Sequence, residues 1–174
     1  MTSHPLSRLL SDAAGGRFPP RDGAVLVAGP PPGPPQAVVS FTASHVIATA
    51  APGDEIRSRL DPDDLGAPMD AGFLAWLGGR IGRRVGTLDV VLSAAGTGSL
   101  PDWERITDEA HPRVQRALRY RDAVAVYRSG PGTIVLGDGL AGRCEVAVDV
   151  ERVARDRGLG TDRDAAQQAD ENGH

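Results

Sequence analysis

The sequence contains no lysine, because all 19 of its Lys+Arg residues are arginine. This absence excludes enzymes that form a Schiff base on lysine and excludes the P-loop, whose lysine binds phosphate. Aromatic residues make up only 4% of the chain and the formal net charge is −4, so the chain lacks the base-stacking platform and the basic groove that nucleic-acid binding needs. We therefore predict no nucleic-acid partner.

Cysteine and long apolar runs are also scarce. Cys144 is the only cysteine, which excludes an internal disulfide and a thiolate zinc cluster. No stretch approaches the roughly 18 apolar residues of a membrane span, and the first residues lack the apolar core of a secretory signal. We expect a soluble cytoplasmic protein with no membrane partner.

Two features invite a metal ion, and neither has the spacing of a metal site. The acidic run at Asp61, Asp63 and Asp64 lacks the closing glutamate of an EF-hand, so a solvated loop is favoured over calcium binding. His111 has no histidine or carboxylate at ligand spacing, so a capping or surface role is favoured over that of a base or a ligand. We predict no bound metal.

The first half of the chain combines β-prone runs with proline and glycine. We assign residues 1–86 to a β-rich N-terminal extension. Its predicted elements are a helix at Pro5–Ala14 and strands at Ala24–Ala28, Ala37–Thr42 and His45–Thr49. The proline-rich linker between the first two strands has the Pro-x-x-Pro spacing of a polyproline ligand at Pro31 and Pro34, although a stiff connector is the favoured interpretation.

A helix and a strand are predicted next. Asp70 is a candidate N-cap for a helix in which apolar residues recur every four positions, at Phe73, Leu77, Ile81 and Val85. The apolar run that follows predicts a strand over Thr87–Ser93.

The last third of the chain predicts a helix and three antiparallel strands. The helix begins at Pro112, with His111 at its cap. The strands are expected at Ala123–Tyr127, Thr133–Leu136 and Arg143–Val150, joined by the glycine-rich turns RSGPG and GDGLAG. In the last strand Cys144, Val146, Val148 and Val150 share one face, and Glu145, Ala147, Asp149 and Glu151 share the other.

A loop of the form R-x-x-G-x-G follows this strand, with Arg155, Gly158 and Gly160 at the motif positions. A glycine-rich loop that leads into a helix N-terminus exposes backbone N–H groups to an anion, and the helix dipole favours negative charge there. The pattern predicts a pyrophosphate-binding loop.

These segments together resemble the GNAT family, the Gcn5-related N-acetyltransferases. The resemblance rests on RDRGLG after EVAVDV, and on the segments HPRVQRALRYRD and LGDGLAGRCE. It implies a transferase of the acyltransferase class that moves acetyl from the cosubstrate acetyl-CoA to an unidentified amine by direct attack. It further implies that backbone groups near Val148 and Val150 pair with pantetheine, and that the loop containing Arg155, Arg157, Gly158 and Gly160 holds the pyrophosphate.

Glu145 is the candidate general base that the resemblance implies, because family members often place a glutamate on this strand. A glutamate on the solvated side of the strand is the simpler interpretation, and the sequence leaves both open. The expected fold class is α/β (α+β), with a GNAT-like, mixed and mainly antiparallel sheet flanked by helices.

The family fold continues well beyond the loop, whereas this sequence ends at His174. We therefore expect residues 87–174 to be a partial GNAT-like acyl-CoA-binding domain, truncated after the pyrophosphate loop, with the C-terminal half of the fold missing. The alternative is a non-catalytic remnant that acts as a binding or interaction module. Its unfinished sheet edge would then allow a homodimer.

Overall fold

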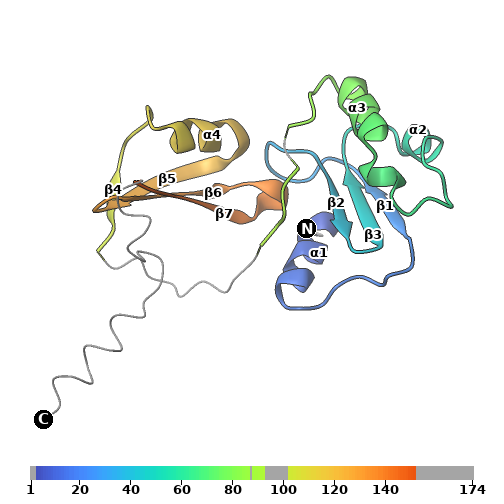
Figure 1. Cartoon of the computed structure of the whole chain (residues 1–174), viewed down its shortest axis with the longest axis horizontal. Coiled ribbons are helices and arrows are strands. Elements are labelled where there is room, and N and C mark those ends of the chain that lie inside the picture. Colours follow the sequence, from blue (N-terminus) through green and yellow to red (C-terminus); the bar gives the residue numbers. More distant parts are fainter. Residues whose placement is uncertain (1–2, 87, 93–101, 152–174) are drawn as a thin grey trace, which may run out of the picture.

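The computed structural model of the chain describes residues 3–86, 88–92 and 102–151. The described elements form two sheets (Figure 1), one of three strands in the order β1-β3-β2 and one of four in the order β4-β5-β6-β7. The predicted α+β class with mainly antiparallel strands is confirmed at this level. In chain order the elements are α1 (Pro5–Ala14), β1 (Val25–Ala28), β2 (Ala37–Phe41), β3 (Ser44–Ala48), α2 (Gly53–Arg57), η1 (Ala67–Met69), α3 (Ala71–Arg80), β4 (Glu104–Ile106), α4 (Pro112–Tyr120), β5 (Asp122–Ser129), β6 (Gly132–Asp138), η2 (Leu140–Gly142) and β7 (Cys144–Val150).

The first sheet is buried on both faces of its central strand. β3 runs parallel to β1 and antiparallel to β2, and all five of its residues are buried. Val46 packs with Leu6 of α1 on one face, whereas Ile47 packs with Ile56 of α2 and Phe73 of α3 on the other. Because successive strand residues face opposite sides, one short strand anchors helices on both.

Helices α1 and α3 begin where the sequence predicts. Asp70 caps α3, since its carboxylate accepts hydrogen bonds from the N–H groups of Gly72 and Phe73 at 2.8 and 2.9 Å. The helix ends at Arg80, so the apolar stripe does not continue to Val85, which is 55% exposed. Gly82 adopts a φ of 66°, a left-handed conformation that ends a helix.

The strand predicted over Thr87–Ser93 is wrong for its described part. Leu88–Leu92 forms no strand, and its apolar side chains are 62–88% exposed. Thr87 and Ser93 lie outside the described residues. A β-prone sequence forms a strand only where a neighbouring strand pairs with it, and local pattern cannot report whether one is present.

The second sheet is the predicted antiparallel meander, with a short fourth strand. β5 pairs with β6, β6 with β7, and the three residues of β4 pair with β5. The helix α4 covers one face of this sheet (Figure 1), where Val114 and Ala117 contact Val126 and Val135. Val114 and Val135 are 2% and 0% exposed, so this layer is the core of the second sheet.

The alternation predicted for β7 is confirmed, but the covered face is the polar one. Ala147 packs against the α4 core, which places Glu145 and Asp149 on the side of the helix. Val146 and Val148, on the other face, are 58% and 49% exposed. Glu145 therefore lies on the α4 side of the strand with polar partners, although 37% of its side chain remains exposed.

The two sheets meet where η2 contacts α1. The Ser7 hydroxyl donates to the carbonyl of Ala141 at 2.8 Å, and Arg143 Nη1 donates to Ser11 Oγ at 3.0 Å. Ala141 is 5% exposed and belongs to the same apolar cluster as Leu6. The tip of the β6–β7 hairpin is thus held against the first helix.

In the part of the chain that the structure describes, no helix has the length and apolar character to cross a membrane.

The buried histidine of the first sheet predicts a pH-dependent stability. His45 is 4% exposed, its Nδ1 has no hydrogen-bond partner among the described residues, and burial lowers its pKa. Between the lowered folded-state pKa and the ordinary histidine pKa, the unfolded state therefore binds more protons than the folded state. The free energy of unfolding decreases as the pH falls through this range. The slope is at most about 1.4 kcal/mol per pH unit. Denaturant titrations at pH 7, 6 and 5 should show this fall in the wild type and a flatter profile in His45→Leu. Equal slopes in the two proteins would contradict the assignment.

Candidate functional site

The edge strand β7 is the part of the predicted site that the structure describes. It is the last strand of its sheet among residues 102–151, and it pairs with β6 only. Glu151 N donates to Pro131 O at 3.0 Å and Gly139 N donates to Arg143 O at 2.8 Å, and both pairs continue the register of the β6–β7 ladder. In an antiparallel pair of strands, residues that hydrogen-bond to the neighbouring strand alternate with residues whose N–H and C=O groups point away from it. The N–H and C=O groups of Val146 and Val148 therefore point to the outer edge.

The other predicted binding residues divide into one that is described and four that are not. Val150 ends β7, is half-buried and pairs with Gly132 of β6. Arg155, Arg157, Gly158 and Gly160 lie outside the described residues. The structure thus describes the strand that leads into the candidate loop.

Glu145 lies at the start of β7 and contacts two segments distant from it in the fold. Its Oε2 accepts a hydrogen bond from Arg121 Nε at 2.9 Å, and its Oε1 accepts one from Leu140 N at 2.9 Å. The side chain is 37% exposed. A Cβ added to Gly139 would lie 2.2 Å from Glu145 Cδ, so glycine makes room for this carboxylate. These hydrogen bonds join the hairpin tip to the C-terminal end of α4 through Glu145.

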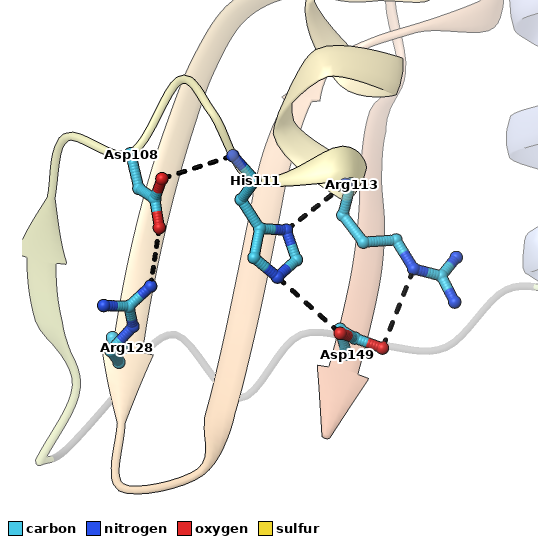
Figure 2. Close-up of polar contacts among 5 residues, drawn as sticks. All are labelled: Asp108, His111, Arg113, Arg128 and Asp149. Carbon is cyan, nitrogen blue, oxygen red and sulfur yellow. Dashed lines mark hydrogen bonds and ion pairs between the residues drawn. The ribbon is translucent and has the colours of Figure 1, made fainter. Parts of the chain in front are cut away.

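A polar cluster lies at the other end of β7, beside the N-terminus of α4 (Figure 2). His111 Nε2 lies 3.6 Å from Asp149 Oδ2, and Arg113 Nε lies 3.9 Å from Asp149 Oδ1. The carboxylate of Asp108 accepts a hydrogen bond from His111 N at 3.2 Å and pairs with Arg128 Nη2 at 2.7 Å. The cluster joins α4 and β5 to the end of β7 that leads into the candidate loop.

The contacts of His111 make it a helix cap, as predicted. Its Nδ1 accepts a hydrogen bond from Arg113 N at 3.2 Å, so the proton of the neutral ring is assigned to Nε2, which faces Asp149. The lone pair of Nδ1 is thereby used in capping the helix, and Nε2 lies near Asp149. Asp149 is the partner that sequence reasoning missed, because the contact depends on strand pairing and on helix placement rather than on spacing.

The acidic loop of the first part lines two hollows. The hollows have volumes of about 270 and 260 Å³, and Asp61 and Asp64 line both. Each carboxylate accepts a backbone hydrogen bond within the loop, Asp61 from Asp63 N and Asp64 from Gly66 N. Across the described ranges, no group of three or more His, Cys, Asp or Glu side chains could hold a metal ion.

Comparisons of the chain with protein-family models, with curated proteins and with solved structures find no match.

Proposed function

We propose that residues 87–174 form a GNAT-type acyl-CoA site and that the protein is an N-acetyltransferase. The observation that carries this proposal is the place of β7 at the edge of its sheet among the described residues, with outward backbone groups at Val146 and Val148. The R-x-x-G-x-G loop follows this strand in the sequence. The order of the elements also supports the proposal, since a helix is followed by three antiparallel strands and then by a glycine-rich loop. A cytoplasmic location, where acetyl-CoA is available, is part of the proposal.

The proposed binding mode uses backbone groups more than side chains. The amides of pantetheine pair with the outer edge of β7 near Val148 and Val150, as an added strand pairs with a sheet. The N–H groups of residues 155–160 hold the pyrophosphate, with Arg155 and Arg157 adding positive charge and Gly158 and Gly160 allowing close approach. A pyrophosphate site of this kind needs no lysine.

The proposed reaction is a direct transfer. The lone pair of the acceptor amine attacks the thioester carbonyl, a C–N bond forms and the C–S bond breaks. The amine loses a proton to a base, and the CoA thiolate takes up a proton as it leaves. Glu145 is the proposed base, and it lies on the strand face opposite to the valines.

Isothermal titration calorimetry of the full chain with acetyl-CoA tests the proposal. The expected result is a saturable heat with one site per chain, and a similar heat with CoA alone because the binding groups contact pantetheine and pyrophosphate. The absence of heat at millimolar CoA, with the protein shown to be folded by circular dichroism, would overturn the proposal.

A binding protein without catalysis is the second candidate function, and the contacts of Glu145 favour it. Both carboxylate oxygens already accept a hydrogen bond, from Arg121 and from the backbone of Leu140. Both oxygens are therefore occupied by partners within the fold, and one of these hydrogen bonds would have to break before Glu145 could contact a substrate amine.

The variant Glu145→Gln separates the two candidates. If Glu145 is the base, acetyl transfer should fall by about 10²-fold or more while the Kd for CoA stays unchanged. If its role is structural, the free energy of unfolding should fall by about 1 kcal/mol or less, since the pair with Arg121 is partly solvated. The readouts are release of CoA measured by chromatography across a panel of amines, and denaturant titration. A thiol reagent is unsuitable because Cys144 is exposed.

A further inference from the structure

The tip of the β6–β7 hairpin, which is the short turn η2, is held from two sides. On one side it contacts α1, where the Ser7 hydroxyl donates to the carbonyl of Ala141 at 2.8 Å. Ala141 is buried in the same apolar cluster as Leu6, and Leu140 packs against that cluster. On the other side, Leu140 N donates to Glu145 Oε1 at 2.9 Å. Two adjacent residues of η2 thus connect α1 with Glu145.

The backbone conformation of the tip depends on these surroundings. Ala141 has a φ of 58° and a ψ of 29°, a left-handed conformation that residues other than glycine seldom adopt. Such a conformation persists only where the surrounding contacts hold it in place. The contacts with α1 and with Glu145 therefore stabilise one conformation of the same short segment, and the loss of either contact favours its release.

The two hydrogen bonds of Glu145 differ in what anchors the donor. Arg121 directly follows α4, its side chain is 15% exposed, and its Nη1 also donates to the carbonyl of Val135 in β6 at 3.5 Å. This donor is fixed within the second sheet and its helix. Leu140 N belongs to η2, a turn of three residues between two strands. The bond from Leu140 is therefore the one that breaks when the tip moves.

We infer that η2 is a switch that couples α1 to Glu145. While the tip is docked on α1, both carboxylate oxygens of Glu145 accept a hydrogen bond. When the tip leaves α1, Leu140 N leaves Glu145, and Oε1 is free to accept a hydrogen bond from another donor. The coupling acts in both directions, because both contacts bias the same equilibrium. Its bearing on catalysis rests on the proposed function, in which the released Oε1 is the atom that takes the proton of the amine.

Amide hydrogen exchange of the full chain, followed by NMR without acetyl-CoA, tests the switch. Ser7→Ala removes the hydroxyl that holds the tip on α1. Exchange at the Leu140 amide should become about fivefold faster, the change expected for the loss of one ordinary hydrogen bond. The amides of Gly142 and Arg143, which donate within the tip, should change by the same factor because the tip opens as one unit. The amide of Val135, in the core of the second sheet, should not change.

Two variants test the coupling in the opposite direction. Glu145→Ala removes the carboxylate, and Gly139→Ala places a side chain in the space that the carboxylate occupies. Each variant should speed exchange at Gly142 and Arg143 by about fivefold or more, since hydrogen bonds to charged groups exceed ordinary ones. Because Gly139→Ala retains Glu145, a misfolded Glu145→Ala protein does not leave this direction without a test.

The matched control is Ser58→Ala. Ser58 Oγ donates to the carbonyl of Glu55 at 2.8 Å, so this variant removes an equivalent hydrogen bond from another helix of the first part. Its exchange rates in the tip should stay within about twofold of the wild type. A Leu140 rate in Ser7→Ala that matches this control overturns the inference, and so do unrelated changes at Leu140 and Gly142.

This experiment separates the switch from the proposed function. Because exchange is measured without acetyl-CoA, a failure of calorimetry to detect CoA binding overturns the proposed function and leaves the exchange result standing. Unchanged exchange at Leu140 in Ser7→Ala overturns the switch alone, whatever the chain binds.

Discussion

Replacing Gly158 with aspartate is expected to weaken the binding of acetyl-CoA by at least about tenfold. The proposed loop holds the pyrophosphate on backbone N–H groups, which a side chain at this position obstructs, and the new carboxylate repels the bound anion. A tenfold change in Kd corresponds to about 1.4 kcal/mol. The loss of a hydrogen bond and the added repulsion are together large enough to account for this difference. Calorimetry of the variant against the wild type measures the change.

The matched control for this variant is Gly86→Asp. A Cβ at Gly86 meets nothing within 4 Å, so the substitution adds the same charge at an open position. Its Kd for acetyl-CoA should stay within about twofold of the wild type. If Gly158→Asp binds as tightly as this control, the loop does not hold the pyrophosphate.

Replacing Ile47 with alanine is expected to lower the free energy of unfolding by about 2–5 kcal/mol. Ile47 is 0% exposed and lies on the central strand of the first sheet, packed in the same cluster as Ile56 and Phe73. Removing its outer atoms leaves a cavity that the strand, paired on both sides, cannot readily close. Denaturant titration measures the loss.

Val90→Ala is the control for this stability prediction. Val90 is 84% exposed, so the same kind of truncation should change the free energy of unfolding by about 0.5 kcal/mol or less. Equal losses in Ile47→Ala and Val90→Ala would contradict the core described for the first sheet.

The parts of the fold that the sequence predicts correctly are those fixed by local chemistry. Asp70 is followed by the N–H groups that it caps, and the β-prone runs of the first sheet and of the meander find partners. The strand prediction fails at Leu88–Leu92, where the outcome depends on a neighbouring strand to pair with. The helix prediction fails at its end for a local reason, because Gly82 adopts the left-handed conformation that ends α3 before Val85.

In the candidate site, too, the sequence predicts the local features and misses the contacts between distant residues. The alternation along β7 is visible in the sequence, but which face is covered depends on α4 and on polar partners far along the chain. Arg121 contacts Glu145, and His111 contacts Asp149, through pairings that spacing does not encode. The glycine loop itself is recognised only from its sequence, since residues 155–160 lie outside the described part.

Hydrogen–deuterium exchange of the full chain with and without acetyl-CoA locates the residues that bind the cosubstrate. We expect acetyl-CoA to slow exchange at the outward amides of Val146 and Val148 and across residues 155–160, with the first sheet unchanged. Slower exchange confined to the first sheet, or no change in β7 at saturating acetyl-CoA, would contradict this expectation.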